Sequence, residues 1–284
     1  LEKRMVLASD TVVINGKSYS IGFNTILRSG DKPSDDSDIF GIIYDKFGNP
    51  IVNEDGSNYL SDSNDFASLL TGTDGNMYMV SHFENSPGAM YITKLKQDAK
   101  GILTAEKTRH LDFSGVEGGW VHCAGSVTPW GTHLGSEEYE PDGKLADPAT
   151  GKVTTDYGNM IATYFGLVTD STVAGYYNGM NVYNYGWQVE VKVTDYSNVS
   201  VEKHYTMGRV AHELGYVMPN RKTAYISDDG TNVGLFRFEA DTEGDLSSGE
   251  LFAAKWTQTS AENGGSANIS WISLGHATDA EIKA

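Results

Sequence analysis

Short stretches of alternating apolar and polar residues dominate the chain. They are rich in β-branched and aromatic residues, and the clearest lie at 77–80, 89–92, 187–193, 223–226 and 233–238. Glycine, asparagine, aspartate and serine separate them, as in turns between strands. Helical periodicity is confined to the short acidic segment 277–284. The pattern therefore predicts an all-β fold built from many short strands.

A weak internal repeat refines this prediction. The segments 74–84, 129–138 and 220–229 share one layout, in which a turn leads into a strand and then into a small residue with acidic residues. If each segment belongs to a similar sheet, the acidic residues lie at the ends of equivalent strands. We therefore expect these strand ends to converge on one axis, where carboxylates can share cations.

The spacing of the repeat indicates the kind of fold. Ser81 and Ser136 occupy matching places 55 residues apart, and Ser227 follows 91 residues later, or 48 when the Gly/Tyr/Asn-rich stretch 142–184 is left out. A period of about 40–50 residues is typical of a four-stranded propeller blade. We predict a single β-propeller domain over 1–284, or the N-terminal portion of one, with an insertion at about 142–184.

The charge balance limits the partners. The chain has 21 lysines and arginines against 38 aspartates and glutamates, a net charge of −17. Nucleic acid and anionic membranes are poor partners for such a chain, and no apolar run reaches the 18 residues of a membrane span. An anionic substrate would need bound cations to reverse the local field. Most of the carboxylates fit a solvated surface, and the others could form a cation site.

Candidate chemistry is densest in the segment 118–138. It combines Cys123 with two histidines and with the neighbouring acids Glu137 and Glu138. Carboxylates suit hard cations, whereas a thiolate suits a softer transition metal. Taken alone, Cys123 fits a small buried apolar residue better than a ligand. The single cysteine excludes an internal disulfide and does not identify the compartment.

Two later segments add further candidates. In 207–215, Glu213 is a possible metal ligand and Arg209 a possible anion-binding residue. Asp228 and Asp229 precede a glycine, a pattern that on its own usually marks a turn.

Taken together, these segments resemble the PhoX-type alkaline phosphatase family. That family has a Cys-Ala-Gly-Gly-x-Thr-Pro-Trp-Gly-Thr run followed by Glu-Glu, then Gly-Arg-x-x-His-Glu, and then Asp-Asp before a strand. The corresponding segments here are 123–132 with 137–138, 208–213, and 228–229 before 234–238. Upstream, 64–66 and 82–84 resemble the family's Asn-Asp-aromatic and Asn-His-Glu signatures, and the motifs occur in the family's order over roughly 12–275.

The sequence also departs from the family pattern. Ser126 replaces a motif glycine, 135–136 reads Gly-Ser where the family tends to have Thr-Cys, and Phe83 separates the histidine and glutamate of the upstream signature. PhoX enzymes are also much longer than 284 residues.

The resemblance implies a β-propeller with an iron and calcium cluster (Fe³⁺ and Ca²⁺) near its axis. It also implies hydrolysis of phosphate monoesters, a small phosphate-ester substrate, and a secreted or periplasmic location. Carried over by motif, the first-ranked cluster ligands are Cys123, Glu137, Glu213 and Asp228; Glu84, Glu138 and Asp229 rank second. Arg209 is the candidate catalytic residue, placed to donate charge-assisted hydrogen bonds to the phosphate.

Two other interpretations fit parts of the sequence. The first is a non-catalytic calcium-binding β-propeller that acts as an extracellular binding or structural module, with the insertion touching a partner. Such a module would hold calcium alone, whereas the enzyme would also hold iron. The second is a calcium-dependent lactonase or phosphotriesterase propeller, which fits the fold but does not explain the cysteine motif.

Overall fold

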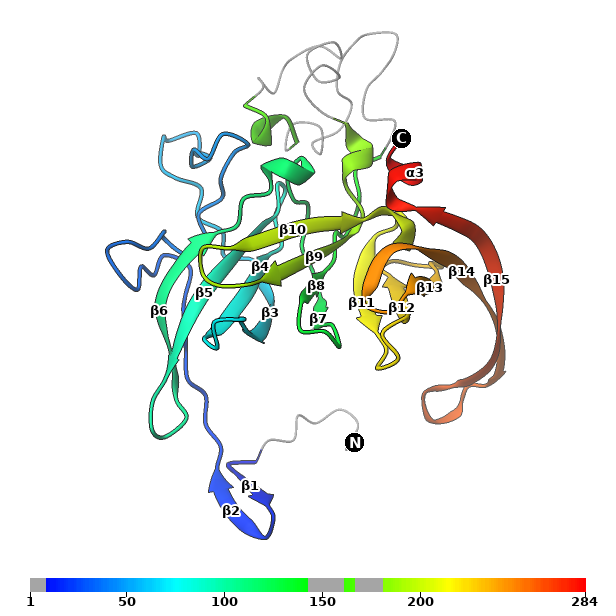
Figure 1. Ribbon diagram of the computed structural model, residues 1–284, viewed down its shortest axis with the longest axis horizontal. Helices are drawn as coiled ribbons and strands as arrows, with labels where there is room; N and C mark the ends of the chain where they lie inside the picture. The colour runs from blue at the N-terminus through cyan, green and yellow to red at the C-terminus, as the bar shows by residue number, and fades with distance from the viewer. Residues whose placement is uncertain (1–8, 143–160, 167–180) are drawn as a thin grey trace.

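The computed structural model describes residues 9–142, 161–166 and 181–284. Most of the predicted insertion, and the N-terminal Leu1–Arg4, lie outside this part of the chain. Within it, strands form one hairpin and three larger antiparallel sheets, each following the chain in simple up-and-down order (Figure 1). This confirms the predicted all-β class.

Each larger sheet consists of consecutive strands. The first contains β3 (Asn64–Thr71), β4 (Met77–Phe83), β5 (Ala89–Gln97) and β6 (Leu103–His110). The second contains β7 (Gly125–Val127), β8 (His133–Gly135), β9 (Gln188–Val193) and β10 (Val199–His204). The third contains β11 (His212–Val217), β12 (Thr223–Asp228), β13 (Leu235–Thr242), β14 (Asp245–Ser260) and β15 (Ser266–Thr278). Two sheets thus have the predicted four strands, and the third has five.

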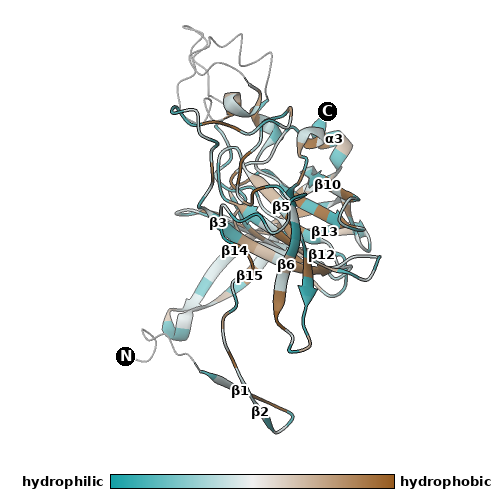
Figure 2. Cartoon of the chain, turned by 90° about the vertical axis from the view of Figure 1, so that its left-hand side faces the viewer, coloured by the Kyte–Doolittle hydropathy of each residue, from teal (hydrophilic) through white to brown (hydrophobic). Residues whose placement is uncertain are grey.

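The remaining elements are small. The hairpin of β1 (Thr11–Ile14) and β2 (Lys17–Ser20) is exposed along its length and lies apart from the sheets (Figure 2). The predicted C-terminal helix is α3 (Asp279–Lys283), which begins with a capping box of Thr278 and Glu281. No helix among the described residues is long and apolar enough to cross a membrane.

The sheets pack on one another through apolar faces. Between the first and second sheets lies a cluster that includes Tyr78, Ile92 and Val191. Between the second and third, Leu134 contributes to a cluster with Ile226 and Phe238. These side chains come from period-two positions of their strands, so the alternating sequence pattern produces one buried face per contact. The result is three blades stacked side by side.

Tight turns connect the strands of each blade. Between β3 and β4, the Gly75 backbone N–H donates to the Gly72 carbonyl at 3.0 Å, and Gly75 has a φ of 77°. This left-handed conformation favours glycine, so the Asp74-Gly75 pair allows the chain to reverse here.

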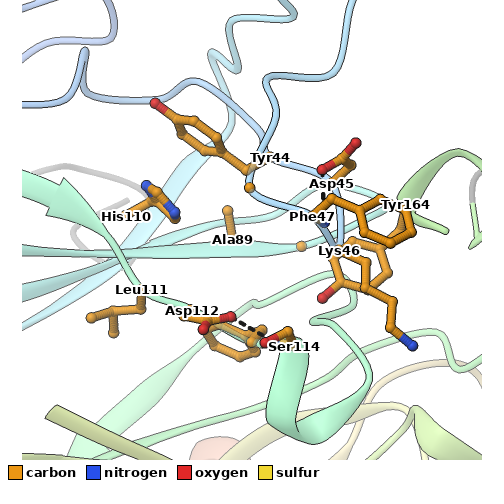
Figure 3. Close-up of a pocket in the computed structure, with 13 residues that line it drawn as sticks. Tyr44, Asp45, Lys46, Phe47, Ala89, His110, Leu111, Asp112, Ser114 and Tyr164 are labelled. Carbon is orange, nitrogen blue, oxygen red and sulfur yellow. Dashed lines mark hydrogen bonds between the residues drawn. The ribbon is translucent and has the colours of Figure 1, made fainter. Parts of the chain in front are cut away.

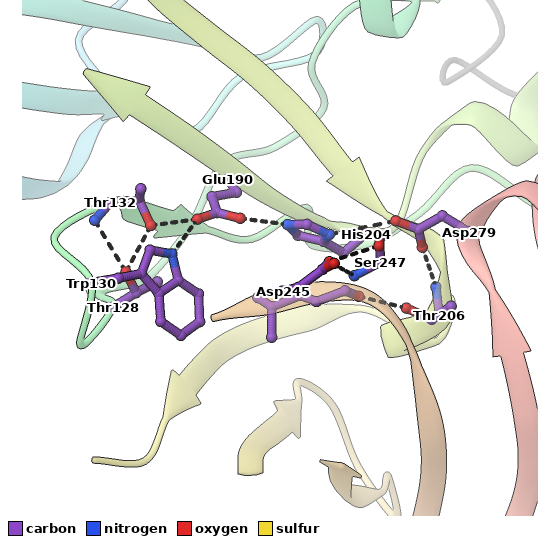
Figure 4. Close-up of polar contacts among 10 residues, drawn as sticks. Thr128, Trp130, Thr132, Glu190, His204, Thr206, Asp245, Ser247 and Asp279 are labelled. Atoms are coloured by element: carbon purple, nitrogen blue, oxygen red, sulfur yellow. Dashed lines mark hydrogen bonds and ion pairs between the residues drawn. The ribbon is translucent and has the colours of Figure 1, made fainter. Parts of the chain in front are cut away.

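A buried polar network joins the second sheet to the C-terminal helix. His204 lies between two carboxylates, with Nε2 2.8 Å from Glu190 and Nδ1 3.5 Å from Asp279 (Figure 4). Trp130 and Thr132 donate hydrogen bonds to the other oxygen of Glu190. Burial alone would lower the pKa of His204, but its bonds to Asp279 and Glu190 outweigh this effect and raise that pKa to about 9. His204 is therefore a buried cation at neutral pH.

Candidate metal centre

Six potential metal-binding side chains gather at one end of the three blades. Each blade supplies one residue at or just before the start of its first strand and one that follows the end of its second strand by one to three residues. In chain order these pairs are Asp65 with Glu84, Cys123 with Glu138, and Glu213 with Asp229. The first two strands of each blade are antiparallel, so the start of one lies beside the end of the next.

A repeated backbone hydrogen bond fixes these pairs. The N–H of Glu84 donates to the Ser63 carbonyl at 2.8 Å, and that of Glu138 donates to Val121 at 3.0 Å. In the third blade the N–H of Asp229 donates to Ala211 at 2.8 Å. In every case the acceptor lies two residues before the other member of the pair. The three blades thus present their donors with the same local geometry.

Cys123 is the common member of two possible metal-binding groups. Asp65, Glu84 and Cys123 form one group, and Cys123, Glu138 and Glu213 form the other; within each, the ligand atoms lie within 4.8 Å of one another. The Cys123 thiol donates to Glu213 Oε2 at 3.4 Å. Hard oxygen donors are thus combined with one softer sulfur donor.

The electrostatics of the site favour a bound cation. Burial, the hydrogen bond to Asp229 and the charge of Glu213 raise the pKa of Glu138 to about 8. Burial also raises the pKa of Glu84, with a further contribution from Asp65. The pKa of the Cys123 thiol is raised by burial and by the charges of Glu138 and Glu213. Crowded acids resist ionisation, and a cation among them would remove that penalty.

Tyr139 and Asp229 form the rim of the site. The Tyr139 hydroxyl donates a hydrogen bond to Asp229 Oδ2. This bond and the one with Glu138 lower the pKa of Asp229, so this carboxylate ionises more readily than Glu138 beside it. Tyr139 has a φ of 46°, an unusual value for a residue other than glycine.

The PhoX alkaline phosphatase family model matches residues 88–283. The chain belongs to the PhoX family. The resemblance carried by the cysteine and glutamate motifs is thus confirmed.

A solved PhoX structure supports the fold. The chain resembles Pseudomonas fluorescens PhoX in complex with vanadate, a transition state analogue, with a TM-score of 0.51 and 16% sequence identity. The match covers 88% of this chain and 55% of the Pseudomonas fluorescens chain, so this chain spans about half the length of that protein. No curated protein matches this chain in sequence. Together with the three blades, this likeness identifies the fold as a β-propeller.

The PhoX motif contains two adjacent glutamates, and only the second reaches the candidate site. The family resemblance ranks Glu137 above Glu138 as a metal ligand. In the structure, however, Glu137 is fully buried and its Oε1 lies 2.8 Å from the Lys203 ammonium. Its other oxygen accepts hydrogen bonds from the N–H groups of Gly186 and Trp187 at 3.0 and 3.2 Å. Neighbouring side chains of extended backbone point in opposite directions, so Glu137 faces the interior while Glu138 faces the site. The structure does not support Glu137 as a ligand.

The same alternation separates the two aspartates of the third blade. Asp228, ranked first from the sequence, accepts a hydrogen bond from the Gly234 N–H at 3.2 Å, and neither it nor Asp229 belongs to the two metal-binding groups. Asp229, ranked second, lies beside Glu138. Of the expected cluster, Glu213 lies in a metal-binding group with Cys123 and Glu138, and Asp229 rather than Asp228 is hydrogen-bonded to Glu138.

The arginine of the PhoX motif, Arg209, donates hydrogen bonds to backbone carbonyl groups. The Arg209 guanidinium donates to three backbone carbonyls, those of Tyr185 at 2.8 Å, Pro141 at 2.7 Å and Val182 at 3.2 Å. It also lies over the Tyr183 ring. Burial lowers the pKa of Arg209. These contacts hold the loop around 182–185, and a role of Arg209 in binding phosphate stays a prediction.

Asp65 was not among the ranked ligands. The only sequence signal for it is the upstream Asn64-Asp65-Phe66 motif, whose link to the cysteine becomes clear once β3 is placed beside β7. Another hollow, of about 220 Å³, lies among Tyr44, His110, Asp112 and Tyr164 (Figure 3). None of the six donors lines it, so it is distinct from the candidate metal centre.

Proposed function

We propose that the chain carries the metal centre of a phosphatase that hydrolyses phosphate monoesters. The observation that supports this most strongly is the pair of donor groups that share Cys123, in a chain that belongs to the PhoX family. We further propose that the centre holds calcium and iron. Carboxylates provide the oxygen ligands that Ca²⁺ prefers, and the Cys123 sulfur provides a ligand suited to iron.

The donor chemistry assigns a part to each residue. Cys123 and the Glu138–Glu213 pair would hold the softer ion, because the sulfur lies in hydrogen-bond contact with Glu213. Asp65 and Glu84 would hold calcium at the more exposed side of Cys123. Bound cations supply charge neutralisation for a phosphate dianion and lower the pKa of bound water. Tyr139 would keep Asp229 oriented at the rim through its hydrogen bond.

Charge explains why such a protein needs cations to accept its substrate. The chain has a net charge of −17, and the candidate site is itself lined with carboxylates. A phosphate ester would be repelled by these groups unless cations present a positive surface. The Arg209 guanidinium donates to three backbone carbonyls through Nε and Nη2, so we propose that bound cations present that surface.

A second candidate is a non-catalytic propeller that binds calcium only. Two observations favour it: the chain spans 55% of the PhoX chain that it resembles, and the predicted phosphate-binding arginine is engaged elsewhere. Metal content separates the two candidates, because the module would contain calcium without iron.

The test combines elemental analysis with turnover of p-nitrophenyl phosphate by the purified protein. Glu138→Gln removes one carboxylate ligand from the centre, and Glu262→Gln, in the exposed turn between β14 and β15, is a matched control. We expect iron and calcium in the parent and in the control, and loss of iron and of turnover in Glu138→Gln. Calcium without iron or turnover would favour the binding module, and a parent without either metal would overturn both candidates.

The compartment is a separate proposal. We propose that the protein acts outside the cytoplasm, as the family resemblance implies. Fractionation of native cells tests this, and recovery of the protein in the cytoplasmic fraction would overturn it.

A further inference from the structure

A chain of buried side chains runs from the first blade to the backbone of Cys123. The Ser68 hydroxyl on β3 is 2.8 Å from His133 Nδ1 on β8. His133 Nε2 is 2.6 Å from His82 Nε2 on β4, and His82 Nδ1 is 2.5 Å from the Cys123 carbonyl oxygen. None of these three side chains is among the proposed metal ligands. This series of hydrogen-bonded side chains crosses between the first two blades, which lie side by side in Figure 1.

The chemistry of the end groups sets the direction of this chain. A carbonyl oxygen only accepts, so His82 Nδ1 carries a proton and donates to Cys123. If His82 is neutral, its Nε2 is bare and accepts from His133 Nε2–H. His133 Nδ1 is then bare and accepts from the Ser68 hydroxyl. Each donor has one acceptor, and the proton positions follow from one end to the other.

Burial favours the neutral form that this direction requires. Both imidazoles are fully buried. The alternative, a cationic His82 that donates at both nitrogens, would place an unpaired charge in the interior.

The residues around His82 and His133 restrict the positions of the two imidazole rings. A Cβ on Gly135 would lie 2.7 Å from His82 Nε2, so only glycine accommodates the ring at this position. The Phe66 ring covers both imidazoles, with ring centroids 5.8 Å from His82 and 5.9 Å from His133.

A second hydrogen bond fixes the backbone next to Cys123. The Ser136 hydroxyl donates to the Ala124 carbonyl at 2.6 Å, next to the carbonyl that His82 binds. Two consecutive carbonyl groups are thus fixed by buried side chains, and the Cys123 side chain projects from this fixed backbone toward Glu213.

We propose that Ser68, His133 and His82 form a one-directional hydrogen-bond relay that positions the Cys123 thiol against Glu138 and Glu213. These are positioning residues, since they reach the site only through the backbone of Cys123. The relay acts on the thiol itself, independently of the proposed phosphatase function, so neither metal nor turnover is needed to test it.

The test uses the two ends of the relay. Ser68→Ala removes the first donor without adding volume, and Ser68→Thr keeps the hydroxyl as the matched control. Nitrogen-15 NMR of the metal-free protein reports which ring nitrogen of each histidine carries the proton. Because Cys123 is the single cysteine of the chain, the rate of alkylation by iodoacetamide at fixed alkaline pH reports on its thiol alone.

We expect His82 protonated at Nδ1 and His133 at Nε2 in the parent and in Ser68→Thr. In Ser68→Ala we expect the same protonated nitrogens, because the Cys123 carbonyl sets the direction, and alkylation about fivefold faster, the factor that the loss of one hydrogen bond allows. Faster alkylation follows because a released loop lets the thiol leave its hydrogen bond with Glu213 and meet the reagent. A parent protein with His82 protonated at Nε2, or a folded Ser68→Ala protein with a parental alkylation rate, would overturn the proposal.

A second variant guards against misfolding. His133→Gln retains a donor toward His82, so we expect its alkylation rate to stay near that of the parent. His133→Phe removes the donor and should react faster. If the two variants react equally, the relay does not position the thiol and serves only to pack the blades together.

Discussion

His204 should make the folded state less stable as the pH rises above neutrality. Its imidazolium lies between Glu190 and Asp279 and is almost fully buried, which joins the second blade to the C-terminal helix. The perturbation is His204→Gln, which keeps a hydrogen-bonding side chain but cannot take up a proton.

The magnitude follows from the pKa of His204, which rises from 6.5 to about 9 on folding. At about 1.4 kcal/mol per unit, this shift contributes on the order of 3 kcal/mol to the free energy of unfolding. A raised pKa means that the folded state binds the proton more tightly. The contribution is therefore complete below pH 6.5 and is lost as the pH rises through about 9.

The assay is chemical unfolding of the parent and His204→Gln at a series of pH values, with the difference in the free energy of unfolding plotted against pH. Taking the difference removes the effect of other groups, including Glu138, whose pKa is raised to about 8. We expect the difference to be constant below pH 6.5 and to shrink by about 3 kcal/mol toward pH 9. A difference that does not change over this range would refute the reasoning.

Three further predictions concern the buried ion pair and the candidate centre. Lys203→Met leaves the Glu137 charge buried without its partner and should cost on the order of 3–5 kcal/mol in denaturant unfolding, with metal content unchanged; loss of metal would return Glu137 to the centre. A chelator should lower the melting temperature of the metal-loaded protein, because ions that bind only the native state stabilise it, and an unmoved melting curve would argue against a bound cation. Cys123→Ser should lose iron and retain calcium by elemental analysis, since a hydroxyl is a poor iron ligand; a variant that keeps its iron would remove the sulfur from the proposed ligand set.

Much of the metal centre could be predicted from the sequence repeat. The three repeated segments end on Glu84, Glu138 and Asp229, and the structure places these residues at equivalent ends of the second strand of each blade. A period of two along a strand also predicts that only one of two adjacent acids can face the site.

The choice within each adjacent pair could not be predicted in the same way. Glu137 is excluded because Lys203, 66 positions later in the chain, reaches its carboxylate from β10. From the sequence, Arg209 fits an anion-binding residue. Its three hydrogen-bond acceptors are backbone carbonyls, which residue type alone cannot reveal. Both contacts arise from packing between distant segments.

The sharing of donors among blades bears on how the protein would unfold. Each proposed group joins two blades: Asp65 and Glu84 of the first with Cys123 of the second, and Cys123 and Glu138 of the second with Glu213 of the third. Without the ions, each blade is held to the next mainly by its own apolar contact, and hydrogen exchange can reveal separate openings of the blades. With both ions bound, opening any one blade would break the coordination of at least one of them. Amide protons in β3, β8 and β11 would then exchange at a common rate, set by a single cooperative event.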